Sequence, residues 1–251
     1  MILKDFFAEH RRTALAYSGG TDSAYLLYAG LKCGADIKAF YVHSPFQPQF
    51  ELDDAVRLAG MLGADMQVIE LNILKNENAA RNGPGRCYFC KWEIMGSIIS
   101  AASAQGYELL IDGTNASDDA GDRPGMRALK ELRVLSPLRL CGLDKPEIRR
   151  LSREAGLFTW NKPAYACLAT RVPCGERIDA EKLRKIELGE NLLSEMGFSD
   201  FRLRLRGENA LLQFTERDME KAVSQLPLIR EKLGGDFAEL NIDPAARKES
   251  L

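Results

Sequence analysis

Six small or polar residues near the N-terminus are the first that could do chemistry. S-G-G-T-D-S occupies positions 18–23, between an apolar run at 13–17 and an apolar helical pattern at 23–33. Glycines at a strand-to-helix turn let backbone N–H groups approach an anion, and the helix N-terminus adds partial positive charge. The serine and threonine hydroxyls add donors. The segment therefore suits a phosphate or pyrophosphate, although a helix-capping turn uses similar residues and the Walker-type lysine is absent.

Cysteines form a second chemically capable group. Cys87 and Cys90 stand three apart behind the glycines of 83–85, at the expected start of a helix whose dipole favours thiolate. This C-x-x-C spacing is compatible with a zinc knuckle, a redox pair, a pair of cluster ligands or two buried residues. Cys167 lies in A-C-L-A-T-R, so we expect the positive charge of Arg171 nearby.

Three arginines alternate with leucines in F-R-L-R-L-R-G. The two-residue period of a strand places Arg202, Arg204 and Arg206 on one face and Leu203 and Leu205 on the other. A solvated face would have the same pattern. Three like charges in a row nevertheless favour an anion bound among them.

The elements that must position these residues alternate between strand and helix patterns. We expect strands at 13–17, 37–42, 66–71 and 108–111, with a weaker candidate at 133–135, and helices at 23–33, 51–62, 88–105 and 145–155. Such alternation is typical of a parallel, doubly wound Rossmann-like sheet with helices on both faces. Beyond 175, helices at 180–196 and 218–233 and strands at 201–206, 210–214 and 238–242 indicate a smaller α/β domain. The predicted domains are 1–175 and 176–251.

Composition excludes several classes of protein. The net charge of −2 gives no global positive field for nucleic acid or an anionic membrane. Charged residues among the first twelve exclude the apolar core of a signal peptide, and no run is long enough to span a membrane. We therefore expect a cytoplasmic protein whose six cysteines are not a disulfide framework. Cys33 and Cys141 are expected to be packing residues.

S-G-G-T-D-S resembles the S-G-G-x-D-S signature of the PP-loop, or N-type, ATP pyrophosphatases. The resemblance implies that the loop binds ATP with magnesium, holds its β,γ-pyrophosphate and transfers AMP to an oxygen of the substrate. It assigns Ser18, Gly19, Gly20, Asp22 and Ser23 to the pyrophosphate. Asp22 is given a catalytic part, as the residue that positions magnesium or the leaving group.

Four further stretches, at 85–91, 111–118, 121–132 and 160–175, make the whole chain similar to the LarE family. The resemblance implies an ATP-dependent sulfur transferase acting on a pyridinium dicarboxylate mononucleotide in the synthesis of a nickel-pincer nucleotide. Adenylation is required because oxide is a very poor leaving group, whereas AMP is displaced when sulfur attacks the acyl carbon. The partner would be this small molecule, without nucleic acid or membrane, and a homo-oligomer is expected.

The same resemblance implies two sources of sulfur. In one subgroup the cysteine matching Cys167 gives up its sulfur and becomes dehydroalanine. In another, cysteines matching Cys87, Cys90 and Cys167 hold a 4Fe-4S cluster with one iron open to carry sulfide. We favour the cluster. Cys174 stands where the family has tyrosine, and it is either a fourth ligand or a buried residue.

Further candidate residues concern the substrate and the nucleotide. By the resemblance, Arg202 and Arg204 match a pair of arginines that bind substrate phosphate. Arg123, in the loop G-D-R-P-G, is a candidate phosphate contact. His43 ends the second predicted strand, near the expected adenine position, and either acts as a base or is held structurally. Two aspartates after the fourth strand, Asp112 and Asp118, either bind magnesium or cap their loop.

Two other functions remain open. A tRNA thiolase of the PP-loop superfamily also uses a C-x-x-C pair with a third cysteine, but the acidic balance of this chain does not favour RNA binding. A non-catalytic adenine-nucleotide sensor would use the same fold and would bind ATP without releasing pyrophosphate. The complete S-G-G-T-D-S loop makes the sensor the least favoured of the three.

Overall fold

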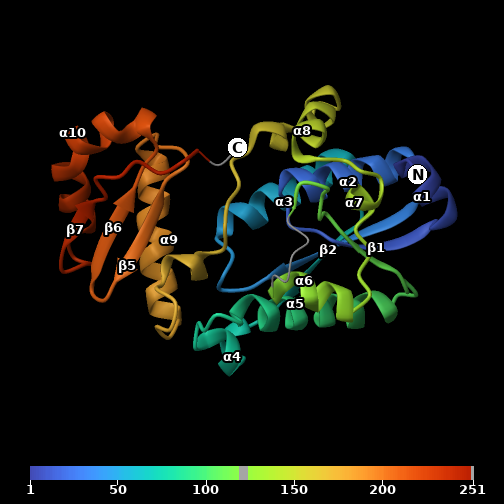
Figure 1. The fold of residues 1–251 in the computed structure, drawn as a ribbon, viewed down its shortest axis with the longest axis horizontal. Helices are drawn as coiled ribbons and strands as arrows, with labels where there is room; N and C mark the ends of the chain where they lie inside the picture. Colours follow the sequence, from blue (N-terminus) through green and yellow to red (C-terminus); the bar gives the residue numbers. More distant parts are fainter. Residues whose placement is uncertain (119–123, 250–251) are drawn as a thin grey trace. The chain divides into compact units, whose positions relative to one another are not determined.

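The structure, a computed structural model, describes residues 1–118 and 124–249. It divides into two compact units (Figure 1): unit 1 comprises Met1–Ile73 and Gly85–Lys162, and unit 2 comprises Leu74–Pro84 and Pro163–Leu251. The sequence predicts a single boundary after residue 175. In the structure, the chain belongs to unit 2 already from Pro163 onward. The segment Leu74–Pro84 also belongs to unit 2 and forms an excursion of the chain out of unit 1.

Unit 1 is built on a four-stranded parallel sheet in the order β3-β2-β1-β4. Its strands are β1 (Arg12–Ala16), β2 (Asp36–His43), β3 (Met66–Glu70) and β4 (Leu110–Asp112). The chain winds outward from β1 to β3 and then returns to place β4 on the other side of β1. The point where the winding reverses therefore lies between β1 and β4, which is where doubly wound sheets bind ligands.

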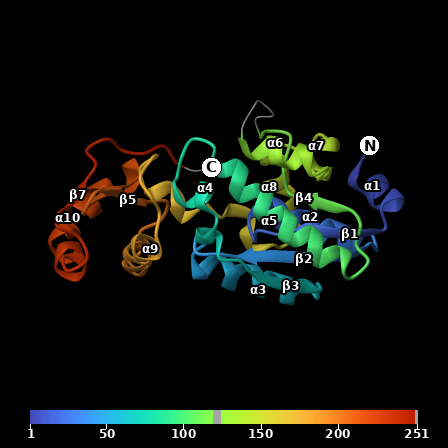
Figure 2. The same cartoon turned by 90° about the horizontal axis from the view of Figure 1, so that it is seen from below.

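Helices cover both faces of this sheet, as the fold class predicts (Figures 1 and 2). One face carries α1, α2, α3, α7 and α8, and the other carries α5 and α6. The bounds are α1 (Leu3–Glu9), α2 (Thr21–Lys32), α3 (Gln49–Leu62), α5 (Arg86–Ser103), α6 (Pro124–Glu131), α7 (Pro137–Leu140) and α8 (Lys145–Glu154), with 3-10 turns η1 (Ile73–Lys75) and η2 (Phe158–Asn161).

Alternation along the strands explains why the sheet needs two cores. Leu15 and Tyr41 point into the core under α2 and α3, while Ala14 and Phe40 point into the core under α5 and α6. Successive side chains of a strand face opposite sides, so a strand covered on both faces is apolar at nearly every position. The central strands β1 and β2 have this character at 14–16 and 39–42, where their sequences are continuously apolar.

Unit 2 contains a three-stranded sheet in the order β5-β6-β7, with β5 and β6 antiparallel and β6 and β7 parallel. Helix α9 packs so tightly on β5 that a Cβ atom at Gly189 would lie 2.3 Å from Leu203 Cδ1. The bounds are α4 (Glu77–Ala80), η3 (Leu168–Arg171), α9 (Ala180–Glu195), β5 (Arg202–Arg206), β6 (Asn209–Gln213), α10 (Glu216–Leu233) and β7 (Leu240–Ile242).

A buried asparagine joins the Leu74–Pro84 excursion to the rest of unit 2. The Asn82 amide donates to the carbonyls of Val172 and Pro173, at 3.2 and 2.8 Å, and its own carbonyl accepts from Gly175 N. Asn82 is 1% exposed and has a φ of 55°, a conformation that asparagine tolerates better than most residues. These bonds explain why the excursion belongs to unit 2 although unit 1 precedes and follows it.

The predicted α/β fold class is confirmed, and one predicted strand is not. The weak candidate at 133–135 contributes a single bridge, between Ile111 and Leu135, because Arg133 has a left-handed φ of 56° that interrupts extended backbone. Among the described residues, no helix has the length and apolar character needed to cross a membrane.

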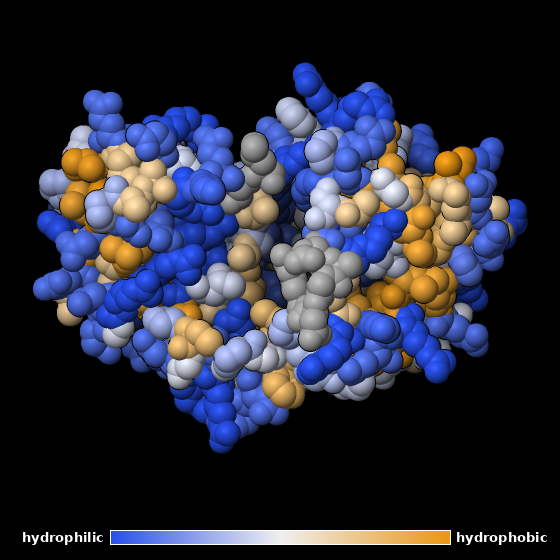
Figure 3. All heavy atoms as spheres, viewed as in Figure 1, coloured by the Kyte–Doolittle hydropathy of each residue, from blue (hydrophilic) through white to orange (hydrophobic). Residues whose placement is uncertain are grey.

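Apolar side chains also reach the surface. Met1 and Ile2 before α1 are each more than 60% exposed, and Leu140 in the neighbouring α7 is half-exposed. Figure 3 shows orange, apolar atoms gathered on unit 1, while most of the visible face of unit 2 is hydrophilic. The homo-oligomer expected from the sequence stays a prediction.

Candidate active site

The S-G-G-T-D-S loop follows β1 and leads directly into α2. Gly19 has a φ of 71°, and a Cβ atom there would lie 2.9 Å from Ala55 Cβ and 3.3 Å from the carbonyl oxygen of Glu51 in α3. Position 19 therefore requires glycine both for its conformation and for its close contact with α3. Gly20 is the N-cap of α2 and brings no side chain to cover the helix N-terminus. The first backbone N–H groups of α2 have no acceptor within the helix, as at every helix start, and no N-cap side chain takes the place of one.

Two serines hold the loop in shape. Ser18 Oγ and Ser23 Oγ lie 3.1 Å apart, and Ser23 Oγ also accepts from Ser18 N at 3.3 Å. The Gly20 amide donates to Ser18 Oγ at 3.4 Å. Thr21 is fixed from outside the loop, because its hydroxyl donates to the carbonyl of Thr159 at 2.7 Å. The hydroxyls thus order the cradle, here defined as residues 18–23.

Asp22 connects the cradle to two later segments. Its Oδ2 accepts from Lys145 Nζ at 2.7 Å and from Asn115 Nδ2 at 3.3 Å. Its Oδ1 is buried and has no hydrogen-bond partner among the described residues. A carboxylate oxygen is the ligand type that magnesium prefers. The remaining oxygen of Asp22 therefore fits the magnesium that the sequence predicts with ATP.

The loop after β4 lies directly against the cradle. A Cβ atom at Gly113 would lie 2.8 Å from the amide nitrogen of Ser23, so only glycine lets the two segments approach this closely. Asn115 follows in the same loop and reaches Asp22. The two loops meet at the carboxyl ends of β1 and β4, where the direction of winding reverses.

The two aspartates of this loop cap it. Asp112 accepts from the amide and hydroxyl of Thr114, at 3.2 and 2.6 Å, and from Ser136 Oγ at 2.7 Å. Asp118 Oδ2 accepts from the Asn115 amide at 2.8 Å. Of the two uses that the sequence left open for Asp112 and Asp118, the structure shows the capping one. Arg123 lies outside the described residues.

His43 is held at the end of β2. Its Nδ1 lies 3.1 Å from Glu70 Oε2, and Glu70 is its register partner at the end of β3. Of the two roles predicted for His43, a base or a structurally held residue, this hydrogen bond fits the structural one.

Cys87 and Cys90 lie in the first turn of α5, as the sequence predicts. Cys87 is exposed, with its sulfur 3.8 Å from Arg86 Nη2, and Cys90 is half-buried. The exposed ring of Trp92 follows on the same helix, 5.9 Å from the ring of Tyr88.

Cys167 and Cys174 belong to unit 2, whereas Cys87 and Cys90 belong to unit 1. All four are free cysteines with at least partial exposure, so their sulfurs are suitable donors for iron or zinc. Within residues 1–118 and 124–249, however, the structure gathers no three cysteine, histidine or carboxylate side chains in a way that could hold a metal ion. The 4Fe-4S cluster stays a prediction. Cys174 is exposed, so the expectation that it is buried is wrong.

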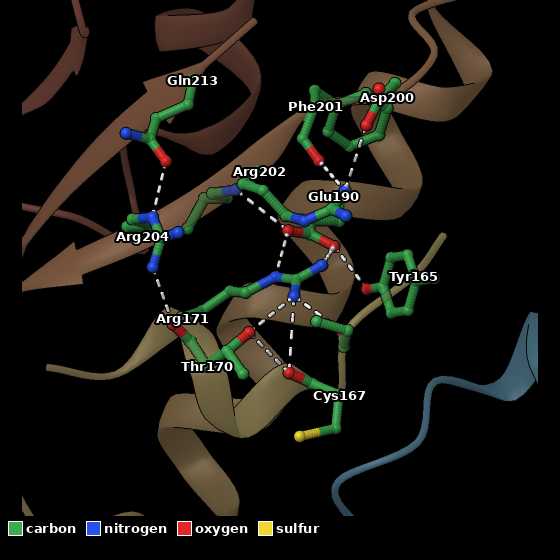
Figure 4. Close-up of polar contacts among 12 residues, drawn as sticks. Tyr165, Cys167, Thr170, Arg171, Glu190, Asp200, Phe201, Arg202, Arg204 and Gln213 are labelled. Atoms are coloured by element: carbon green, nitrogen blue, oxygen red, sulfur yellow. Dashed lines mark hydrogen bonds and ion pairs between the residues drawn. The ribbon is translucent and has the colours of Figure 1, made fainter. Parts of the chain in front are cut away.

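A buried ion pair stands behind Cys167 in unit 2 (Figure 4). Arg171 Nε and Nη2 donate to the two oxygens of Glu190 at 2.8 and 3.0 Å, and both residues are less than 5% exposed. Glu190 also accepts from Leu203 N at 2.9 Å and from the Tyr165 hydroxyl. Burial would lower the pKa of Arg171, but the hydrogen bonds and charge of Glu190 outweigh it and raise that pKa. Burial, reinforced by Glu190, raises the pKa of Tyr165.

The backbone of Cys167 is fixed by this network. The Cys167 carbonyl accepts from Thr170 N and Oγ1, at 3.0 and 2.9 Å, and more weakly from Arg171 Nη1 at 3.4 Å. In Figure 4 the carbonyl points toward Arg171 and the sulfur points away from it. The positive charge expected beside Cys167 is therefore present, but it is directed at the carbonyl.

Arg202 and Arg204 lie on the same face of β5 and are exposed to different extents. Arg202 is 7% exposed and donates to the carbonyls of Phe201 and Ala164, at 2.6 and 2.8 Å. Arg204 is half-buried and donates to Gln213 Oε1 and to the carbonyl of Thr170, at 2.5 and 2.9 Å. Arg206 at the end of the strand is exposed. The predicted alternation is thus present, but the three guanidiniums occupy different surroundings.

These two guanidiniums sit in a positively charged environment. Burial lowers the pKa of Arg202, and repulsion from Arg171 and Arg247 lowers it further. Burial and the charge of Arg171 lower the pKa of Arg204 as well. Asp200, 3.8 Å from Arg202, is shared with Arg247. A bound anion would relieve this excess of buried positive charge, so the strand face is suited to a phosphate.

Glu190, Lys145 and Asn115 are site residues that the sequence did not single out, and of these only Glu190 carried a local signal of its role. Glu190 lies on the apolar stripe of α9, four residues after Ile186 and three before Leu193, so its position predicted burial. Lys145 follows an N-cap aspartate and begins α8, which predicts a helix start but not a contact with the cradle. Asn115 had no local signal, because its contact with Asp22 spans 93 residues.

No model of a protein family matches the chain. The chain is 35% identical to an uncharacterized protein of Synechocystis sp., over 90% of this chain and 85% of that protein. It is 29% identical to the pyridinium-3,5-bisthiocarboxylic acid mononucleotide synthase of Lactiplantibacillus plantarum, over 82% and 75%. It is also 23% identical to the tRNA-specific 2-thiouridylase MnmA of Thermotoga maritima, over 60% of this chain and 54% of that enzyme.

Proposed function

Because this chain belongs to the LarE family and is a sulfur transferase of the PP-loop superfamily, we propose that it transfers sulfur to the carboxylates of a pyridinium mononucleotide. The product would serve the synthesis of a nickel-pincer nucleotide. The observation that carries the proposal is the likeness along most of both chains to a synthase named for a pyridinium bisthiocarboxylate mononucleotide. A negatively charged mononucleotide also suits the cationic face of β5.

Adenylation is the first half of the proposed reaction. A carboxylate oxygen of the substrate attacks the α-phosphorus of ATP, and the bond from that phosphorus to the α,β-bridging oxygen breaks to release pyrophosphate. The cradle holds the leaving group through the amides of Gly19, Gly20 and the first turn of α2. Magnesium, held at Asp22, would neutralise the charge that develops on the pyrophosphate.

Sulfur transfer is the second half. A sulfur nucleophile attacks the acyl carbon of the adenylate, and the carbon–oxygen bond to AMP breaks, so AMP carries away the original carboxylate oxygen. One ATP is consumed for each oxygen replaced. Arg202 and Arg204 are proposed to bind the phosphate of the mononucleotide, because each guanidinium lies in an excess of buried positive charge.

Cys167 is the proposed route by which sulfur reaches the substrate. In the sacrificial form, the Cys167 thiolate attacks the adenylate to give a thioester, and loss of the Cys167 α-proton then breaks its Cβ–Sγ bond. The substrate leaves as a thiocarboxylate and dehydroalanine remains. In the other form, Cys87, Cys90 and Cys167 hold a 4Fe-4S cluster, which when bound would carry sulfide on its open iron.

A tRNA thiolase is the second candidate, favoured by the similarity to 2-thiouridylases. The chain spans only 54% of those enzymes, and its net charge of −2 does not favour RNA.

The test is incubation of the purified protein with ATP, magnesium and pyridinium-3,5-dicarboxylic acid mononucleotide, in parallel with unmodified tRNA. We expect AMP, pyrophosphate and a thiocarboxylate product, detected by mass spectrometry, with the mononucleotide only. Thiolated tRNA without a mononucleotide product would replace the proposal by the second candidate. ATP binding without pyrophosphate release from either substrate would indicate a nucleotide sensor.

A further inference from the structure

The cradle lacks a basic residue of its own. Residues 18–23 contain no lysine, arginine or histidine, although the pyrophosphate that the loop is proposed to hold carries several negative charges. Phosphate loops of the Walker type place a lysine in the loop for this purpose. A cation for this cradle must therefore come from another part of the chain.

Lys145 is placed to supply that cation. Its Nζ lies 2.7 Å from Asp22 Oδ2, although 123 residues separate the two in sequence. The Lys145 side chain is about one-quarter exposed, so it is accessible to a ligand in the cradle. A lysine ammonium on a flexible four-carbon stem can exchange one oxygen partner for another without movement of the backbone.

The backbone of Lys145 is fixed relative to the cradle. Lys145 begins α8, which is capped by Asp144 through a 2.9 Å bond from Glu147 N. The amide of Lys145 itself donates to Ser117 Oγ at 3.0 Å, and α8 packs against α2. The loop after β4, which contacts Asp22, is thus also the loop that anchors Lys145. The bond to Ser117 and the packing of α8 on α2 therefore both fix the position from which the Lys145 ammonium reaches Asp22.

The second oxygen of Asp22 makes the pair more than a structural salt bridge. Oδ1 is buried and has no partner among the described residues, while Oδ2 bonds to Lys145 and Asn115. Leaving a buried carboxylate oxygen without a donor is costly, so this arrangement is suited to a carboxylate that receives a further cation. A magnesium ion held by Oδ1 would repel the Lys145 ammonium and so favour its movement toward a phosphate oxygen.

We propose that Lys145 is the phosphate-binding lysine of this cradle, paired with Asp22 in the free protein and with the β,γ-pyrophosphate of ATP in the complex. The proposal rests on the adenylation step of the proposed function. Lys145 would bind the leaving group, which is present in ATP and in free pyrophosphate but absent from AMP.

Three variants test this assignment by binding alone. Lys145→Met removes the ammonium and keeps much of the stem, and Lys145→Arg restores a positive charge. Arg150→Met is the matched control, because Arg150 lies on the same helix, is exposed and bonds to Glu147 and Glu154. Isothermal titration with inorganic pyrophosphate, ATP and AMP, each with magnesium, measures the three affinities. Thermal unfolding of every variant separates binding from folding.

We expect Lys145→Met to weaken binding of pyrophosphate and of ATP by on the order of tenfold to a hundredfold, the range for one charge-assisted contact. AMP affinity should stay within about twofold, because AMP has no β- or γ-phosphate, and Lys145→Arg should recover part of the loss. Arg150→Met should bind all three ligands as the wild type does. Unchanged pyrophosphate affinity in Lys145→Met would overturn the assignment. Equal losses for AMP and pyrophosphate, with a lower unfolding temperature, would also overturn it in favour of a structural pair.

The binding test of Lys145 and the activity test of the proposed function can fail independently of each other. If Lys145→Met loses pyrophosphate affinity while the wild type makes no thiocarboxylate, the lysine assignment stands and the proposed substrate is wrong. If the wild type releases pyrophosphate and makes product, but Lys145→Met binds pyrophosphate equally well, the reaction stands and the lysine assignment is wrong.

Discussion

Arg171 and Glu190 form a bidentate ion pair that is almost completely buried, with both nitrogen–oxygen distances at 3.0 Å or less. Arg171 ends the 3-10 turn that begins after Cys167, and Glu190 lies in the middle of α9. The pair therefore fixes the Cys167 segment to the helix that supports β5. This single contact links the proposed sulfur-bearing residue to the strand that carries Arg202 and Arg204.

Breaking the pair should destabilise unit 2. Glu190→Gln removes the negative charge and leaves the Arg171 guanidinium buried without compensation, which costs about 3–5 kcal/mol. Chemical denaturation should show this loss. Glu181→Gln, on the same helix but in an exposed pair with Lys185, is the control and should leave the unfolding midpoint nearly unchanged. A Glu190→Gln protein as stable as the control would mean that the pair contributes little.

Asp22 should be needed for adenylation. Asp22→Ala removes the carboxylate that bonds to Lys145 and Asn115 and that is proposed to hold magnesium. Removing one positioned group that stabilises developing charge costs on the order of a hundredfold in rate. Pyrophosphate release from ATP in the presence of substrate is the measurement. Asp53→Ala is the control, because it removes an acidic side chain of α3 that accepts a hydrogen bond from Gln49, outside the cradle. A normal rate for Asp22→Ala would remove Asp22 from the mechanism.

The arginines of β5 should act on the mononucleotide and not on ATP. Arg202→Ala and Arg204→Ala each remove a charge-assisted contact worth about 1.5–3 kcal/mol. Mononucleotide affinity should therefore drop by about one to two orders of magnitude, with ATP affinity retained. Arg206→Ala, at the exposed end of the same strand, should change neither. Similar losses of ATP and mononucleotide binding would indicate that these arginines serve folding.

The source of sulfur can be read from the mass and colour of the protein. If Cys167 gives up its sulfur, transfer should stop after one turnover, and Cys167 should lose the mass of hydrogen sulfide while Cys87→Ser and Cys90→Ser keep some transfer. If the three cysteines hold a 4Fe-4S cluster, the anaerobic protein should be brown and every one of the three serine variants should lose multiple turnover. Dehydroalanine at position 167 in a colourless, iron-free and active enzyme would exclude the cluster.

Cys174→Ser is the matched control for that experiment. Cys174 is exposed and lies in the loop that Asn82 fixes through Pro173. Its replacement should be nearly neutral. Loss of iron or of turnover in Cys174→Ser would instead make it a fourth ligand.

Local chemistry let the sequence alone determine the cradle and the elements around it. The glycines of S-G-G-T-D-S, the apolar runs of β1 and β2 and the apolar stripe of α9 are short-range patterns, because backbone conformation and periodic burial depend on neighbouring residues. They were sufficient to predict a doubly wound α/β fold with a smaller second domain. The candidate strand at 133–135 was wrong because it contained a single left-handed residue, which periodicity does not reveal.

Only the tertiary structure decided which distant residues meet. Lys145 reaches Asp22 across 123 residues, and Glu190 binds Arg171 because α9 packs against η3. Neither pairing has a sequence signature, since a lysine at a helix start and a glutamate within a helix are common in solvated positions. What made them specific is burial: packing removes water from these charges, and each then requires a partner from whichever element the fold brings alongside.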